Sequence, residues 1–168
     1  VKASKKPVTA KMRIGWDGAT RTGPEVARRC EAAGVQLIAV HARTRAQQYT
    51  PGVDYPAVAE IKRAVSIPVL VNGDITDAAS ALRAVEETGC DGVMVGRGAM
   101  GSPWVFREIA AALQGQPVPA PPTLRERMAV MEEQVRGMCE ERGEDIAMRQ
   151  ARGVAAQYMK GVRGAAGL

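Results

Sequence analysis

Residues 68–96 read PVLVNGDITDAASALRAVEETGCDGVMVG, and this stretch decides the fold of the chain. It opens with a short apolar run, continues into a helical period over residues 77–88, and closes with a second apolar run after Gly89. Short apolar runs rich in β-branched residues indicate buried strands, and glycine commonly follows the last turn of a helix. The stretch therefore predicts a strand, a helix and a second strand parallel to the first.

The same pattern occurs four times over residues 1–113. Strands are predicted at residues 8–14, 35–41, 68–72 and 92–96, and helices at residues 23–33, 55–65, 77–88 and 103–113. Thr76 is expected to cap the third helix, and Pro103 fits the first turn of the fourth. The alternation predicts a parallel sheet covered on both faces. Four units make about half of a (β/α)8 barrel, which needs roughly 250 residues; a small open α/β sheet fits the pattern equally well.

A linker and a helical region complete the chain. Residues 114–122, QGQPVPAPP, are rich in Gly and Pro, which excludes a helix or an inner strand. Residues 123–168 are expected to form a small helical domain, with helices over residues 123–142 and 145–161. A capping box of Thr123 and Glu126 starts the first of these helices. An apolar stripe on that helix is expected to be a core face, and it consists of Leu124, Met128, Met131, Val135 and Met138.

Composition is ordinary for a globular protein. The 168 residues carry a net charge of +5, with 46% apolar and 24% charged residues. No segment approaches the roughly 18 apolar residues of a transmembrane helix, so no membrane partner is expected. The three cysteines Cys30, Cys90 and Cys139 lack metal-ligand spacing, which argues against a zinc site or a disulfide framework and favours the cytoplasm. Cys30 and Cys90 are expected to be buried structural thiols.

Chemistry in an α/β barrel sits at the carboxyl ends of the strands. Lys11 is a cation in an apolar strand and therefore requires an anion or acceptor. His41 ends the second strand, where it is either a ligand contact or a structural histidine. Glycine turns after the third and fourth strands predict a phosphate cradle. Gly73, Gly96 and Gly98 allow the backbone to approach a ligand closely, and Arg97 adds a charged side chain to the cradle. Asn72 and Asp74 end the third strand beside Gly73 and also suit a helix cap.

Basic residues gather toward both ends of the chain. Residues 149–168 contain no acidic residue, and Lys2, Lys5, Lys6, Lys11 and Arg13 lie close together in the first third. Such patches suit a polyanion such as RNA, and a solvated surface explains them equally well. The C-terminal cations are Arg149, Arg152, Lys160 and Arg163.

Four segments, in this order, resemble the tRNA-dihydrouridine synthases. They are PVTAKMRIGWDG (7–18), VHARTRAQQYTPGVDY (40–55), IPVLVNGDITD (67–77) and GVMVGRGAMGSPWVFREI (92–109). Residues 149–165, RQARGVAAQYMKGVRGA, resemble the helical domain of the family more loosely. The resemblance implies the C-terminal part of a bacterial-type enzyme that reduces uridine to 5,6-dihydrouridine in tRNA. Such an enzyme uses FMN in a barrel mouth and NADPH as reductant, and is expected to be a cytoplasmic monomer at full length.

The resemblance also implies roles for residues. Lys11 would contact the flavin ring near N1 and O2, and His41 would contact the flavin and face the base. Asn72, Gly73 and Asp74 would line the phosphate and ribityl side, with Gly96 and Arg97 at the phosphate. The residues expected to contact tRNA are Arg43, Arg45, Arg149, Arg152 and Lys160. The chain departs from the family pattern at Ala42 and at Gly153-Val154, where the family has Gly and often Lys-His.

No catalytic residue is assigned within this chain. The family's general acid is a cysteine in an Asn-x-Gly-Cys-Pro motif that lies upstream of the matching segments, and this chain does not contain that motif. The chain alone is therefore expected to be inactive. Two alternatives stay open at this point: another FMN- or phosphate-binding barrel enzyme, similar to the dihydroorotate dehydrogenases, or an RNA-binding module without activity.

Overall fold

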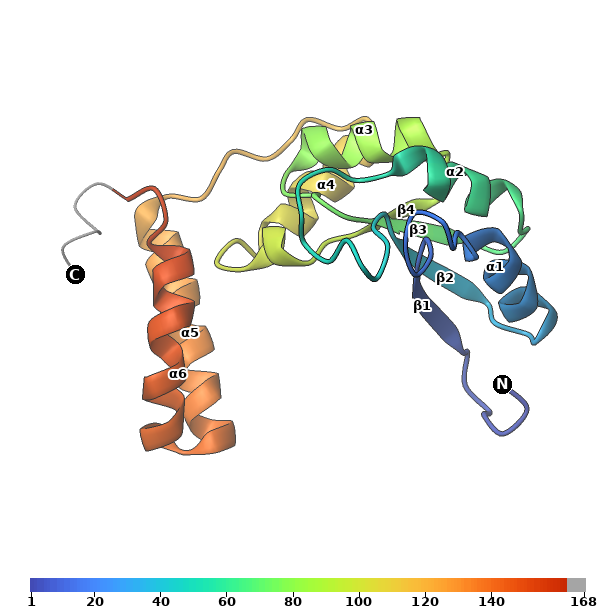
Figure 1. Cartoon of the computed structure of the whole chain (residues 1–168). Coiled ribbons are helices and arrows are strands. Elements are labelled where there is room, and N and C mark those ends of the chain that lie inside the picture. Colours follow the sequence, from blue (N-terminus) through green and yellow to red (C-terminus); the bar gives the residue numbers. More distant parts are fainter. Residues whose placement is uncertain (163–168) are drawn as a thin grey trace. The chain divides into compact units, whose positions relative to one another are not determined.

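The computed structural model describes residues 1–162 of the chain (Figure 1). The chain divides into two compact units, Val1–Gly96 and Arg97–Leu168, and each is described by itself. In the first unit the elements are β1 (Thr9–Arg13), α1 (Gly23–Ala32), β2 (Leu37–His41), α2 (Tyr55–Arg63), β3 (Val69–Asn72), α3 (Ala78–Thr88) and β4 (Gly92–Met94). In the second unit they are η1 (Arg97–Ala99), α4 (Val105–Leu113), α5 (Leu124–Arg142) and α6 (Glu144–Tyr158).

The first unit is built on a parallel sheet, as the alternation of strands and helices predicts. Its strands lie in the order β1-β2-β3-β4, and their register aligns Met12, Val40, Val71 and Val93 in one row. β4 is shorter than predicted and ends at Met94 rather than at Gly96. β4 is an edge strand, so within this unit it has a hydrogen-bonding neighbour on one side only.

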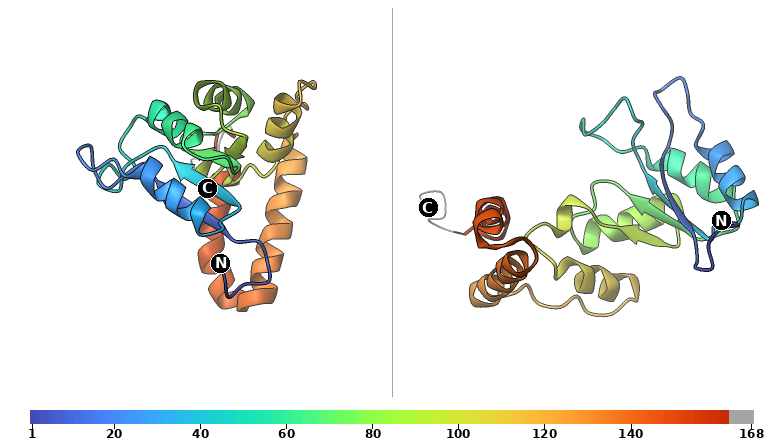
Figure 2. Two further views of the ribbon diagram at one scale, coloured as in Figure 1. Left: turned by 90° about the vertical axis from the view of Figure 1, so that its right-hand side faces the viewer. Right: turned by 90° about the horizontal axis from the view of Figure 1, so that it is seen from below.

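All three helices of this unit lie on one face of the sheet. α1 packs against α2 and α2 against α3, and two views show the helices side by side on that face (Figures 1 and 2). The core lies between the helices and the sheet, where Ile38, Val40, Ile61, Val69 and Val71 are fully buried. The other face has no cover within the unit. The expectation that the strands are covered on both sides is therefore wrong for the first unit.

Local signals at the helix ends are confirmed in part. Gly89 ends α3 in the left-handed conformation (φ 65°). The third helix, however, is capped by Asp77 rather than by Thr76, because Asp77 and Ser80 form a reciprocal capping box. Pro103 precedes α4 instead of entering its first turn, since that helix begins at Val105.

The second unit is a helical hairpin joined to α4. α5 and α6 pack against each other, and the predicted capping box of Thr123 and Glu126 starts α5. The Trp104 ring meets the Tyr158 ring edge-on at 6.1 Å. The Arg127 guanidinium donates to the carbonyl oxygens of Tyr158 and Lys160. These contacts place α4 in the same compact unit as the hairpin, whereas the sequence suggests a division at residue 113.

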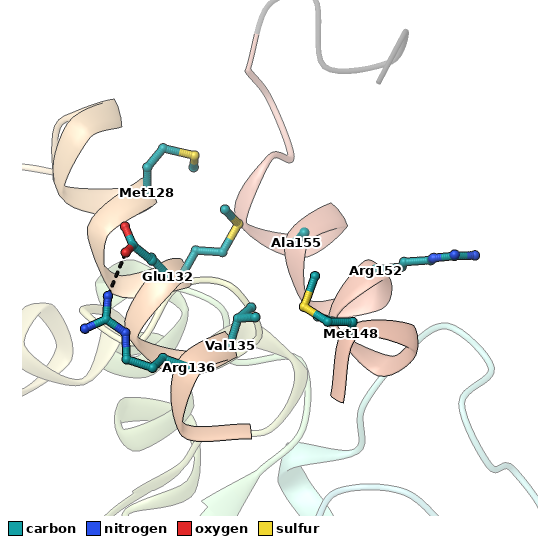
Figure 3. Close-up of a pocket in the computed structure, with 9 residues that line it drawn as sticks. Met128, Glu132, Val135, Arg136, Met148, Arg152 and Ala155 are labelled. Carbon is teal, nitrogen blue, oxygen red and sulfur yellow. Dashed lines mark hydrogen bonds and ion pairs between the residues drawn. The ribbon is translucent and has the colours of Figure 1, made fainter. Parts of the chain in front are cut away.

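The apolar stripe of α5 is only half covered. The helix has no fully buried residue, because α6 is the one described helix that packs along it. A hollow of about 690 Å³ remains between the two helices (Figure 3). Its apolar lining includes Met128, Met131, Val135 and Met148. The expectation that this stripe is a core face therefore holds only in part.

Candidate functional site

The uncovered face of the sheet gathers the polar residues of the strands. The register places Arg13 beside His41 and His41 beside Asn72, in one row at the carboxyl ends of β1, β2 and β3. Lys11 lies two residues before Arg13 and thus points to the same face, because side chains alternate along a strand. This set of Lys11, Arg13, His41 and Asn72 is called the strand-end cluster below.

Three members of the strand-end cluster were predicted from the sequence, and one was missed. Lys11, His41 and Asn72 stand out in the sequence by their type and position, whereas Arg13 is placed in the first strand and in a basic stretch without a role at the site. Its spacing of two from Lys11 within one strand was the available signal. The Arg13 guanidinium donates to the carbonyl of Thr44 (2.7 Å), so a loop holds it at the strand ends.

The electrostatics of the cluster keep His41 neutral. The pKa of His41 is lowered from its ordinary value of 6.5 to about 4. Partial burial is the largest cause, the cations Arg13, Lys11 and Arg43 act in the same direction, and the Asp74 carboxylate opposes them. Burial and then Arg13 also lower the pKa of Lys11. At neutral pH the cluster therefore presents an imidazole that can both donate and accept a hydrogen bond.

Titration of His41 tests this arrangement directly, because the chain has a single histidine. Nuclear magnetic resonance of the imidazole is expected to show a midpoint near pH 4, and Arg13→Ala should raise it by removing the strongest neighbouring cation. Arg63→Ala on the exposed side of α2 serves as the control and should leave the His41 midpoint unchanged.

The lowered pKa of His41 also makes folding stability depend on pH. Because the unfolded chain binds this proton more readily, folding stability should rise with pH between about 4 and 6.5. A midpoint near 6.5 in the folded chain would contradict this description.

The turn after β3 is strained and braced. Gly73 has φ 133° and Asp74 has φ 52°, and the Tyr55 hydroxyl donates to the carbonyl of Gly73 (2.9 Å). Asp74 accepts two hydrogen bonds from the Arg43 guanidinium, at 3.0 and 2.6 Å. A residue with positive φ keeps that conformation only where surrounding contacts hold it in place. Here the contacts come from Tyr55 and Arg43.

Arg43 lies inside the protein rather than on a rim. Its side chain is 2% exposed, and its Nε donates to the carbonyl of Thr50 at 3.0 Å. The expectation that Arg43 meets tRNA phosphates is thus corrected: the guanidinium is occupied by Asp74 and by backbone. Its role in this fold is to hold the Asp74 turn against the loop after β2.

The glycine turn after β4 lies where the two units divide. Gly96 ends the first unit, and no atom lies within 4 Å of a Cβ built on it. Arg97 is exposed and begins η1 of the second unit. The first unit therefore brings Lys11, His41 and the Gly73 turn together, and Arg97 is not among the residues it assembles.

The remaining residues predicted to contact RNA are exposed. Arg45 lies on the loop after β2, with its guanidinium carbon 6.0 Å from the centre of the Trp16 ring. Arg149 and Arg152 lie on α6, Lys160 follows it, and Arg152 is one of the residues that line the hollow (Figure 3). Arg163 lies outside the described residues.

None of the three cysteines lies in a strand of the sheet. Cys90 precedes β4 and is buried, as predicted, and burial raises its pKa. Cys30 on α1 is only half-buried, which corrects the expectation of a buried thiol, and Cys139 lies on α5. Over residues 1–162, His, Cys, Asp and Glu side chains form no group that could hold a metal ion. None of the helices in that range is long and apolar enough to cross a bilayer.

Comparison with known proteins gives a consistent result. A family model described as "Dihydrouridine synthase (Dus)" matches residues 1–168. A probable tRNA-dihydrouridine synthase of Rhodobacter capsulatus is 49% identical, over 87% of this chain and 45% of the relative. One of Mycobacterium leprae is 45% identical, over 94% of this chain and 41% of the relative. tRNA-dihydrouridine synthase B of Pseudomonas aeruginosa is 43% identical, over 98% of this chain and 50% of the relative.

The chain thus spans about half the length of the curated relatives it matches. Among solved structures, a nitroalkane oxidase from Streptomyces ansochromogenes aligns over 55% of this chain and 28% of its own. Its TM-score is 0.40 and its identity is 18%, which is too low to bear on fold or function.

Proposed function

Because this chain belongs to the dihydrouridine synthase family, we propose that its strand-end cluster binds the flavin of an enzyme that reduces uridine in tRNA to 5,6-dihydrouridine. The proposed cofactor is FMN, with NADPH as the reductant. Cytoplasmic location and a monomeric full-length state remain predictions. The family assignment removes the alternative of a dihydroorotate dehydrogenase-like enzyme.

The observation that carries the proposal is the concentration of Lys11, Arg13, His41 and Asn72 on one uncovered sheet face. Parallel strands in sequential order, with all helices on one side, are what four of the eight units of a (β/α)8 barrel look like. We propose that the uncovered face is the inner wall of such a barrel. The cluster would then stand at the carboxyl ends of the strands, where barrel enzymes bind their ligands.

The donors present fit an anionic cofactor. Lys11 and Arg13 supply positive charge, which stabilises a reduced, anionic flavin ring. Asn72 donates its amide hydrogen to the carbonyl of Met94 (2.8 Å) and so turns a defined acceptor oxygen to its surroundings. Asp74 would repel a phosphate if it were alone, but its ion pair with Arg43 offsets that charge. The Gly73 and Gly96 turns would leave room for the phosphate and ribityl chain, with Arg97 as a further phosphate contact.

His41 and the helical hairpin have separate tasks in the proposed reaction. FMN, when bound, supplies the hydride. Neutral His41 can donate a hydrogen bond to a carbonyl of the uracil ring without bringing a full charge. The helical hairpin, with Arg149, Arg152 and Lys160, would hold the tRNA backbone, and a target base would leave its stack to reach the cluster.

No strand of the sheet carries a thiol that could serve as the proton donor for the uracil carbon. Cys30 lies on α1, Cys90 is buried ahead of β4, and Cys139 belongs to α5 of the second unit. We therefore propose that this chain binds flavin without reducing uridine, and that the general acid comes from a residue outside it.

Flavin binding tests the proposal. FMN added to the chain should lose fluorescence as it binds, and Lys11→Met should weaken binding about tenfold or more, because a hydrogen bond to a charged group is lost. Lys5→Met makes the same exchange on an exposed lysine ahead of β1 and should have no effect. Equal affinities of the two variants would contradict the role of Lys11. Tight RNA binding with no flavin affinity would instead favour an RNA-binding module without activity.

A further inference from the structure

One exposed aromatic ring at the strand ends has no role in the flavin site described above. Trp16 follows β1 by three residues, and 64% of it is exposed. The Arg45 guanidinium lies over this ring, 6.0 Å from its centre. We propose that the Trp16–Arg45 pair is a stacking platform for an unpaired RNA base next to the target uridine. This inference rests on the proposed function, since it presumes an RNA substrate.

The backbone holds Trp16 in place although the ring is exposed. Trp16 N–H donates to the carbonyl of Thr20 (3.1 Å), and Asp17 accepts from the N–H groups of Ala19 (3.0 Å) and Thr20 (2.7 Å). Gly15 permits this closed loop, because a Cβ there would lie 2.3 Å from the carbonyl oxygen of Thr20. A ring on a braced loop loses little further freedom when a ligand stacks on it.

The loops after β1 and β2 are tied together beneath the platform. Arg45 N–H donates to the carbonyl of Gly15 (2.9 Å), and Ala46 N–H donates to the carbonyl of Trp16 (2.8 Å). These bonds fix the arginine beside the tryptophan. Both loops leave the same strand ends that carry Arg13 and His41, so the platform stands next to the strand-end cluster.

The chemistry of the pair suits a nucleobase better than a protein side chain. Trp16 is 64% exposed and residues 15–22, GWDGATRT, contain no second large apolar side chain, so the ring does not lie in the well-packed pocket typical of protein hot spots. Bases of single-stranded RNA stack on tryptophan and on arginine planes, and arginine adds attraction to phosphate. Lys11 and Arg13 on the adjoining sheet face extend this positive surface, consistent with a polyanion.

Stacking on Trp16 is testable by fluorescence anisotropy with a labelled uridine nonamer. Trp16→Ala should weaken binding about tenfold, while Trp16→Phe should retain most of the affinity because it keeps an aromatic face. Phe106→Ala is the control, because Phe106 is also exposed (55%) but lies on α4. A nonamer of ribose phosphates without bases should bind wild type and Trp16→Ala equally. Equal affinity of wild type and Trp16→Ala for the uridine nonamer would overturn the inference.

A second measurement leaves Trp16 itself unchanged. In a Trp104→Phe background, Trp16 is the only tryptophan, and the uridine nonamer should quench its emission. Absence of quenching would overturn the platform. FMN binding is measured without RNA, so the two proposals can fail separately. FMN binding without quenching of Trp16 emission by the nonamer would overturn this inference alone. Quenching without FMN affinity would overturn the flavin proposal alone.

Discussion

Asp74→Ala is expected to lower the free energy of unfolding by about 3 kcal/mol, because it leaves the Arg43 guanidinium buried without its anion. Arg43 is 2% exposed and donates to both Asp74 oxygens, at 3.0 and 2.6 Å. Removing one partner of a buried pair costs more than the pair itself contributes, since the remaining charge keeps its desolvation penalty. Asp74 is 39% exposed, which places the expected loss at the lower end of the usual range for buried pairs.

Urea denaturation followed by circular dichroism measures this loss. Glu25→Ala is the matched control, because Glu25 pairs with Arg29 at 2.5 Å on the exposed face of α1. Exposed pairs of this kind contribute about 0.5 kcal/mol or less. In an Arg43→Met background the same Asp74→Ala change should cost far less, which shows that the two side chains act as a unit. A loss at Asp74 no larger than that at Glu25 would contradict the buried pair.

Gly101→Ala is expected to destabilise the second unit by about 3 kcal/mol, because strain and steric overlap act together. Gly101 has φ 68°, which a side chain tolerates poorly. A Cβ there would lie 2.4 Å from the carbonyl carbon of Gln157 and 2.7 Å from the amide nitrogen of Tyr158. These are backbone atoms near the end of α6, so they can yield only if the helix moves away from the turn.

Gly115→Ala separates the two contributions. Gly115 also has φ 68°, but a Cβ added to it would have no atom within 4 Å. The strain alone should cost about 1 kcal/mol. Urea denaturation followed by Trp104 emission, in a Trp16→Phe background, reports on the second unit because Trp104 contacts Tyr158. Equal losses for the two alanine variants would show that the close approach of α6 contributes nothing.

Much of the secondary structure could be predicted from the sequence, because its signals are local. A period of two in the strands and of about 3.6 in the helices arises from neighbours along the chain. The parallel sheet, the left-handed Gly89 and the Thr123 capping box therefore agree with the structure. The ends of the strands are harder to predict. β4 stops at Met94 instead of Gly96, because an edge strand within the unit has no outer neighbour to extend its hydrogen-bond ladder.

The sequence predicts those residues of the candidate site whose type is unusual for their position in a strand. Lys11, His41 and Asn72 stand out because cations, imidazoles and amides are unusual within apolar strands. Arg13 was missed, because its importance comes from lying beside His41 in the register, and registers join residues far apart in the sequence. The burial of Arg43 was missed for the same reason.

The sequence by itself determined the order of strands and helices, the Gly89 and Thr123 helix ends, and the residue types at the strand ends. Only the tertiary structure decided that Arg43 lies inside, bonded to Asp74 31 residues later, and that Arg45 lies over Trp16. Two arginines on one loop, two residues apart, thus lie in opposite environments: Arg43 is buried and Arg45 is exposed. The physical reason is that a pattern along the chain does not say which side chain finds a partner, whereas the contact that offsets the burial of the Arg43 charge comes from the turn after another strand.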